Sequence, residues 1–218
     1  MLILGLVVAT ASSAEPQSTS EKIQAALDHE RRSEQESARD RNRKPLETLE
    51  FFRLRDDMTV LEIMPGGGWY THILGPVLAE NGQLILAIGA ERTGERVKDL
   101  PGFESTTVIP FDRSNFSRAP GNRMMDLPEF SLGLTKVDLA LTFRNLHNFT
   151  PEGRQSINKA VFDSLKKGGY YGVVDHTRRH MQGHSTEVWR RMDPVLANQE
   201  IQAIGFETVD HSTLHYRP

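Results

Sequence analysis

The chain has 218 residues, of which 38% are hydrophobic and 25% are charged, close to ordinary globular values. This length allows one domain with a sizeable core or two very small domains. The net charge of −3 gives no global basic field for nucleic acid. Because the chain has no cysteine, disulfides, thiolate metal sites and cysteine nucleophiles are excluded.

The first residues are typical of an export signal. Leu2 to Ala9 is a short apolar run, and Ser12, Ser13 and Ala14 supply small residues before Glu15. We therefore expect a signal peptide over residues 1–14 and a periplasmic or secreted protein. The run is too short to span a bilayer, so no stable membrane insertion is expected. Because no Lys or Arg precedes it, a cytoplasmic location is the alternative.

Residues 15–44 form a charged linker and arm. Half of the residues from Glu21 to Glu50 are charged, with both signs mixed, and Ile23, Ala26 and Leu27 give only a thin apolar stripe. This pattern predicts a solvated helix that lies against the body, or a partly disordered arm. The basic stretch 39–44 also allows a phosphate-binding patch, but its interleaved acids favour a solvated face.

Strands and helices then alternate over residues 45–218, which we take as one domain. Strands are expected at 59–64, 83–88, 106–109, 137–143 and 170–175. Helices are expected at 46–52, 70–80, 94–100, 151–166 and from 193 to about 204. The last two strands, 206–209 and 213–216, are expected to form an antiparallel edge hairpin. The alternation predicts a three-layer α/β sandwich around a mostly parallel, seven-stranded sheet.

A glycine-rich loop follows the first strand, in the segment LEIMPGGGWY from Leu61 to Tyr70. Such a turn exposes backbone to a ligand, and the next helix N-terminus attracts negative charge. A phosphate-binding P-loop would need Gly-Lys-Ser/Thr here, and a dinucleotide fingerprint would need a Gly or Ala at Thr71. Both alternatives fail, which leaves S-adenosylmethionine among the ligands that commonly use this turn.

Three segments resemble the class I S-adenosylmethionine-dependent methyltransferase family. VLEIMPGGG (60–68) is similar to its first motif, with Met64 in the place of the first glycine; VDLALTFRNLHNF (137–149) and LKKGGYYGVVDH (165–176) are similar to the fourth-strand and pre-fifth-strand motifs. The resemblance is closest to bacterial predicted methyltransferases that carry E-I-x-P-G-G-G-W-Y-T, many with leader peptides. It covers about 45–218 and implies a Rossmann-like domain.

The resemblance implies S-adenosylmethionine as the cofactor and a set of residues that bind it. These are Glu62, Pro65, Gly66, Gly67, Gly68, Trp69, Glu91 and Asp112. Glu91 lies two or three residues after the position of the usual ribose-binding acid, and Asp112 follows the third strand, where the family often contacts adenine. Trp69 and Tyr70 would close over the ligand or anchor the following helix.

Polar side chains at the ends of the fourth and fifth strands are the catalytic candidates. We predict this role for Arg144, Asn145, His147 and His176, with His147 as the best candidate for a base. Asn148 belongs to the same cluster, and Asp175 could orient or charge the imidazole of His176.

The basic segment after the fifth strand contains Arg178, Arg179, His180 and His184. It would suit an acidic acceptor, or a metal held by histidines at 176, 180 and 184. Gly183 interrupts the stretch and no acidic ligand completes it, so a loop is favoured and no metal is predicted.

The predicted activity is S-adenosylmethionine-dependent methyl transfer to a small or medium acceptor molecule. No nucleic-acid partner is expected. The short end of the chain leaves an open acceptor pocket or one covered by a second subunit, so a homodimer is possible. The alternative is a methyltransferase-fold protein of the periplasm that binds another ligand and transfers no methyl group.

Overall fold

The computed structural model describes residues 17–183, 185 and 189–216. Its strands are β1 (Thr59–Ile63), β2 (Gln83–Ala87), β3 (Thr106–Val108), β4 (Val137–Phe143) and β5 (Leu165–Val174). All four pairings between neighbouring strands are parallel, and the strand order is β3-β2-β1-β4-β5. The prediction of a Rossmann-like α/β fold is therefore confirmed.

Helices α1 (Thr19–Asp28), α2 (Glu34–Ser37), α3 (Asp40–Arg43) and α4 (Pro45–Phe51) precede the sheet. Helices α5 (Thr71–Leu78), α6 (Glu91–Val97), α7 (Pro151–Ser164) and α8 (Pro194–Ile204) follow β1, β2, β4 and β5, and short 3₁₀ turns span Arg113–Asn115 and Leu146–Asn148. Local sequence explains several starts. Thr150 caps α7 and Asp193 caps α8, each with a proline at the first helical position.

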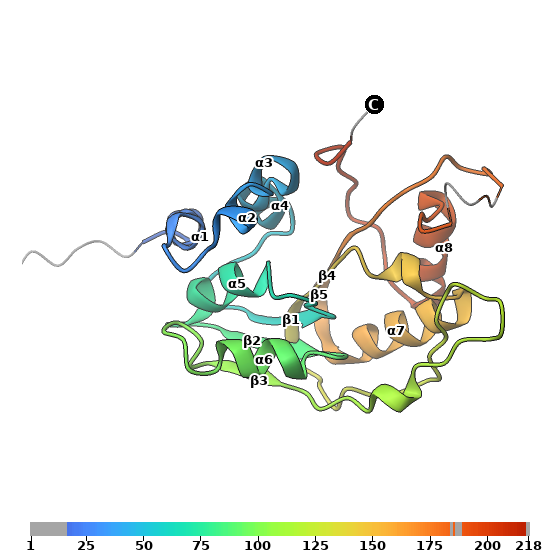
Figure 1. The fold of residues 1–218 in the computed structure, drawn as a ribbon, viewed down its shortest axis with the longest axis horizontal. Helices are drawn as coiled ribbons and strands as arrows, with labels where there is room; N and C mark the ends of the chain where they lie inside the picture. The colour runs from blue at the N-terminus through green and yellow to red at the C-terminus, as the bar shows by residue number, and fades with distance from the viewer. Residues whose placement is uncertain (1–16, 184, 186–188, 217–218) are drawn as a thin grey trace, which may run out of the picture.

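The sheet is the middle of three layers (Figure 1). Alternate side chains of β1 enter different cores: Val60 joins α1, α4 and α5 on one face, whereas Leu61 and Ile63 join α7 on the other. These three side chains are fully buried. The three central strands, β2, β1 and β4, are mostly apolar and buried because helices cover both faces of the sheet.

The prediction of seven strands with an antiparallel hairpin is wrong. The sheet has five parallel strands, and residues 206–216 form no strand. In this tail only Phe206, Leu214 and His215 are partly buried, so the apolar alternation that stabilises an edge strand is missing. Phe206 instead packs on Phe162 and Tyr171, with ring centroids 5.0 and 5.5 Å apart.

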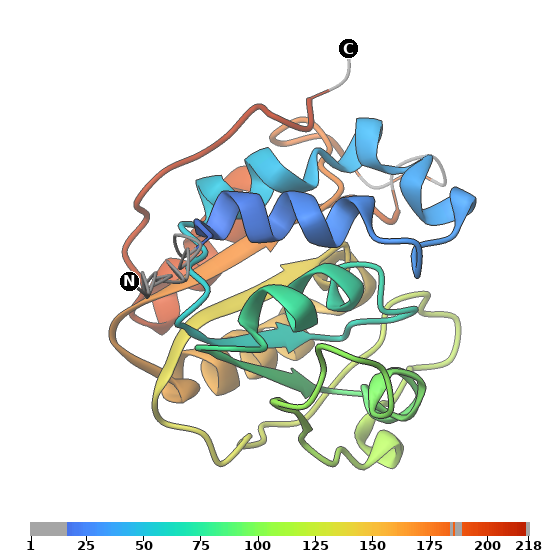
Figure 2. The same ribbon diagram turned by 90° about the vertical axis from the view of Figure 1, so that its left-hand side faces the viewer.

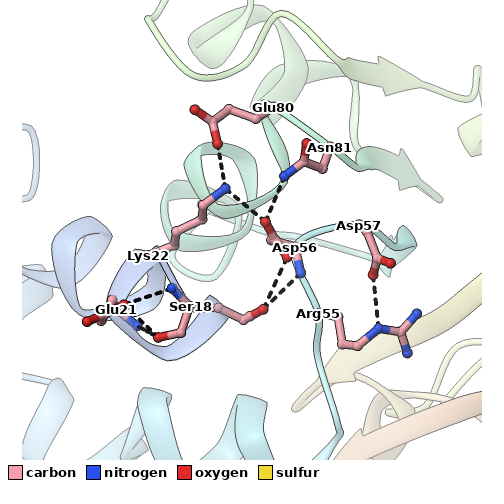
Figure 3. A network of polar contacts seen from close by, with 9 residues as sticks. Ser18, Glu21, Lys22, Arg55, Asp56, Asp57, Glu80 and Asn81 are labelled. Carbon is pink, nitrogen blue, oxygen red and sulfur yellow. Dashed lines mark hydrogen bonds and ion pairs between the residues drawn. The ribbon is translucent and has the colours of Figure 1, made fainter. Parts of the chain in front are cut away.

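The arm is helical in its described part and packs on the domain. Helix α1 lies across α5 (Figure 2). The ammonium of Lys22 bridges Asp56 Oδ2 at 2.8 Å and Glu80 Oε2 at 2.6 Å, and the Asn81 amide also donates to Asp56 (Figure 3). The Lys22 and Asp56 side chains are only 12% and 21% exposed, so this pair is partly shielded from solvent, whereas the Glu80 side chain is 74% exposed.

The largest differences from the expected element boundaries are at the junction of α7 with β5 and at the start of α6. Helix α7 ends at Ser164, and β5 begins at Leu165, with Gly168 and Gly169 inside the strand. The register with β4 shifts at this place, and glycine accommodates such an irregularity. Helix α6 begins at Glu91 rather than Gly94, which puts Glu91 at the start of the helix.

Candidate functional site

The strand order reverses between β1 and β4, which makes a switch point at their carboxyl ends. Ligands of open parallel sheets bind in the crevice at such a point. The glycine loop after β1 and the polar segment after β4 flank this crevice. Asn145 joins them directly, because its amide donates to the carbonyl oxygens of Ile63 and Met64, each at 3.2 Å.

The loop backbone takes conformations that favour glycine. Met64, Gly66 and Gly68 have φ values of 52°, 61° and 85°. Met64 occupies the place of the first glycine in the resembling motif, and it adopts the left-handed backbone that glycine adopts easily. Its N–H donates to the carbonyl of Ala87 at 2.9 Å, which holds it in place. Met64 therefore departs from the motif in sequence, while its backbone adopts a conformation that suits glycine.

The tip of the loop is bare on one side and braced on the other. A Cβ added to Gly66 or Gly67 would meet no atom within 4 Å, and both residues are exposed. A Cβ on Gly68 would lie 3.0 Å from Thr93 Cγ2, and the Thr93 hydroxyl donates to the Gly66 carbonyl at 2.6 Å. Helix α6 thus supports the loop from behind, and a ligand can approach the open backbone of Gly66 and Gly67.

Glu62 lies under this loop rather than on its surface. Its side chain is buried and accepts a hydrogen bond of 2.6 Å from the Thr71 hydroxyl at the start of α5. Burial raises the pKa of Glu62 to about 7, and the bond from Thr71 opposes this rise. Glu62 therefore links β1 to α5 and is placed to support the ligand-facing loop.

Glu91 and Asp112 come together in a second part of the crevice. An open groove is lined by Glu91, Arg92, Pro110, Phe111, Asp112 and Arg113. The Glu91 carboxylate accepts the Phe111 N–H at 3.0 Å, which ties α6 to the loop after β3. Asp112 is exposed and accepts the Ser114 N–H at 2.9 Å. Two acids that are distant in sequence thus face one groove beside the glycine loop.

Trp69 contacts the arm. It is buried, its indole N–H donates to the Glu36 carbonyl at 3.0 Å, and the guanidinium carbons of Arg43 and Arg32 lie 4.4 and 5.3 Å from its ring centroid. Tyr70 packs on Trp69 edge to face. Of the two expectations for this pair, these contacts favour anchoring. The half-buried Pro65 accepts the Gly68 N–H at 3.0 Å within the loop.

Arg144 and His176 meet at the ends of β4 and β5. The Arg144 Nε donates to His176 Nε2 at 2.9 Å. Burial and then the nearby positive charge of Arg144 lower the pKa of His176, which favours its neutral, accepting form. The Arg144 backbone is left-handed, with φ of 64°, and its N–H donates to the Val174 carbonyl at 2.7 Å.

His147 pairs with Asp175 in a buried dyad. The Asp175 carboxylate bonds the His147 Nδ1 and also accepts the backbone N–H groups of His147 and His176, at 3.1 and 2.7 Å. Only 3% of the His147 side chain and 6% of the Asp175 side chain are exposed. Asp175 thus pairs with the ring of His147 rather than with that of His176. The bond to Nδ1 leaves Nε2 as the acceptor nitrogen of a neutral His147.

Arg190 completes the cluster, although it was not among the residues predicted for the site. Its Nη2 lies 2.8 Å from Asn148 Oδ1 and 3.4 Å from His147 Nε2. Forty-two residues separate Arg190 from Asn148 in the chain, and no motif marks it. Thr93 was missed in the same way, because it is one of several polar residues on α6.

The described residues contain no group of three His, Asp or Glu side chains placed to hold a metal ion. His180 Nδ1 lies 3.0 Å from both carboxylate oxygens of Asp193, and His176 bonds Arg144. His184, the third residue of the alternative metal site, lies outside the described residues. The leader expected over residues 1–14 also lies outside them. No described helix is both long and apolar enough to cross a membrane.

Comparison with known proteins extends the account of the fold. No protein-family model matches the chain, and no curated protein matches its sequence. A SAM-dependent methyltransferase from Aquifex aeolicus has a similar structure, with a TM-score of 0.56 at 18% identity over 85% of this chain and 87% of that one. Human N-acetylserotonin methyltransferase, solved in complex with SAM, has a TM-score of 0.56 at 13% identity, over 91% of this chain and 54% of that one.

A third neighbour shows that this fold also serves another reaction. The [4+2]-cyclase SpnF has a TM-score of 0.54 at 18% identity, over 84% of this chain and 62% of the cyclase. At such identities the likeness establishes the fold and leaves the reaction to be argued from the site. The chain therefore has the Rossmann-like fold found in S-adenosylmethionine-dependent methyltransferases.

Proposed function

We propose that this protein is an S-adenosylmethionine-dependent methyltransferase that acts on a small or medium acceptor. The observation that carries the proposal is the exposed backbone at Gly66 and Gly67, where an added Cβ would meet no protein atom within 4 Å. Strand β1, the braced loop and helix α5 present this backbone at the switch point of the sheet.

The residues around the loop suit the parts of this cofactor. Exposed backbone at Gly66 and Gly67 fits its amino acid carboxylate, and the groove with Glu91 and Asp112 offers acids for the hydroxyl and amine groups of adenosine. Glu62 would support the glycine loop from beneath through its hydrogen bond to Thr71 at the start of α5. When bound, the cofactor supplies a methyl group on a positively charged sulfur.

The neighbouring polar edge would orient the acceptor. Methyl transfer is a displacement at carbon, so positioning supplies most of the rate, and a base is needed only when the acceptor loses a proton. His147 is the base candidate because Asp175 holds its Nδ1 and leaves Nε2 to accept. Arg190 Nη2 lies 3.4 Å from this nitrogen, so an acceptor that reaches His147 would also contact this guanidinium.

Calorimetric titration of S-adenosylhomocysteine into wild type and Gly67→Val tests the proposal. Gly67 has an ordinary φ and open space around it, so the valine is expected to preserve folding and to block the ligand. We expect a dissociation constant weakened about tenfold or more. Gly183→Val is the matched control, because Gly183 has the same open surroundings and an ordinary φ. Equal binding by both variants, or no binding by wild type, would contradict the proposal.

We also propose, from the sequence alone, that the protein is exported and that it forms a homodimer. Residues 1–14 would direct the chain to the periplasm, and a second copy could cover the acceptor pocket. Intact mass of protein from the periplasmic fraction should show a chain that begins at Glu15; uncleaved protein in the cytoplasm would support the alternative location. If the wild type fails to bind S-adenosylhomocysteine, the alternative is favoured: a periplasmic protein of this fold that binds another ligand and transfers no methyl group.

A further inference from the structure

Two exposed arginines flank the buried His147–Asp175 dyad, and neutral groups hold both of them. The Arg144 guanidinium donates to His176 Nε2 at 2.9 Å, and Arg190 donates to Asn148 Oδ1 at 2.8 Å. The ring centroids of His147 and His176 lie 5.3 Å apart, so an unbroken series of contacts leads from Arg144 through the two rings to Arg190. Each guanidinium is fixed by a partner that leaves its positive charge intact.

Within the described part of the chain, no carboxylate forms an ion pair with Arg144 or Arg190. Asp175 lies at the same edge, but it is buried and already accepts from the His147 ring and two backbone N–H groups. Arg43 and Arg191 add to the positive field. Burial, and the charge of Arg144 in addition, lower the pKa of Arg43.

This concentration of positive charge contrasts with the net charge of the whole chain, which is −3. Arg144 is also held in a left-handed backbone conformation that is unfavourable for a residue with a side chain. Such strain at a crevice indicates a position that the site requires. The charged area is local, and it lies where an acceptor would have to enter.

We propose that the methyl acceptor is a small organic anion whose carboxylate or phosphate is bound by Arg144 and Arg190. This inference rests on the proposed methyltransferase function and names its substrate class. Guanidinium groups suit such oxyanions because they donate two parallel hydrogen bonds. The anionic group anchors the acceptor, and the rest of the molecule points along the crevice toward the glycine loop.

Three small probes of similar shape test the charge preference: benzoate, phenyl phosphate and the neutral benzamide. Each is titrated into the full chain, with and without saturating S-adenosylhomocysteine. We expect benzoate or phenyl phosphate to bind roughly tenfold more tightly than benzamide. The two anions also distinguish a carboxylate site from a phosphate site. Equal affinity for all three probes would overturn the inference.

Variants show whether the two arginines carry that preference. Arg144→Gln with Arg190→Gln should abolish it, whereas Arg144→Lys with Arg190→Lys should keep most of it. The lysine pair also decides the question if the glutamine pair folds poorly. Arg96→Gln removes one positive charge, as each member of the glutamine pair does, from an exposed position on α6 and should change nothing. Equal losses in Arg96→Gln and the glutamine pair would contradict a specific site.

The outcomes separate the two proposals. Wild type that binds S-adenosylhomocysteine without preferring the anions retains the methyltransferase proposal and loses the acceptor class. Wild type that prefers the anions and fails to bind S-adenosylhomocysteine keeps the anion site and loses the methyltransferase proposal.

Discussion

The crevice has two halves, the glycine loop after β1 and the polar cluster after β4 and β5. The first half exposes backbone, whereas the second half presents side chains. After β1 the backbone of Gly66 and Gly67 is exposed, and an added Cβ on either residue would meet no atom within 4 Å. The Thr93 hydroxyl supports this loop by donating to the Gly66 carbonyl. After β4 and β5 the chain offers side chains, bound to one another in a dense polar cluster around the His147–Asp175 dyad.

Because of this difference, substitutions in the two regions should affect different properties, namely ligand affinity in the glycine loop and folding stability in the polar cluster. A backbone site can be blocked by one added side chain without disturbing the core, because that side chain meets only open space. A buried polar cluster has no such freedom, since each donor and acceptor depends on its partner. We therefore expect substitutions in the glycine loop to change ligand affinity and substitutions in the dyad to change folding.

The largest expected effect on stability is that of Asp175→Ala. Asp175 accepts from the His147 ring and from two backbone N–H groups, which the substitution would leave without a partner in a buried place. We expect the free energy of unfolding to fall by roughly 3 kcal/mol, measured by urea denaturation. Asp112→Ala, at an exposed turn, should change it far less. If both variants lost similar amounts of the free energy of unfolding, the claim that stability depends mainly on the polar cluster would be contradicted.

An effect of similar size is expected at Glu62, and it depends on pH. Burial raises the pKa of Glu62 from its usual 4.5 to about 7 in the folded protein. Between these values the unfolded chain releases a proton that the folded chain keeps, so rising pH favours unfolding. The resulting loss in the free energy of unfolding is absent below pH 4.5, grows as the pH rises and reaches its full value of about 3 kcal/mol above pH 7.

Glu62→Gln removes this titration. Its free energy of unfolding relative to wild type should therefore rise between pH 4.5 and pH 8, measured by denaturation at each pH. Glu207→Gln, at an exposed position, serves as the control for a lost carboxylate. A constant difference between Glu62→Gln and wild type across this range would show that the carboxyl is not perturbed by burial.

Sequence reasoning predicted the five parallel strands and the glycine loop, because buried strands and strand-to-helix turns leave strong local patterns. Val137–Phe143 was predicted with the bounds that the structure has. The prediction of an edge hairpin was wrong because the tail has no buried alternating face, and Phe206 packs on Phe162 and Tyr171 instead of joining a strand.

Within the candidate site, the sequence indicated single residues better than their partners. His147, Asp175 and His176 were all recognised, yet Asp175 pairs with the ring of His147 across 28 residues rather than with its neighbour. Arg190 had no local signal, since its position depends on how the chain returns after β5. Met64 departs from the motif in sequence, and only the backbone angle shows that this position has a left-handed conformation that suits glycine.

Hydrogen–deuterium exchange with and without saturating S-adenosylhomocysteine tests the central claim most directly, because it locates the ligand on the chain. We expect slower exchange at 64–71, 88–93 and 110–116, and little change at 144–148, where the acceptor half lies. Gly67→Val should lose this protection and Gly183→Val should keep it. Protection confined to other segments, or none at saturating ligand, would contradict a cofactor site on the glycine loop.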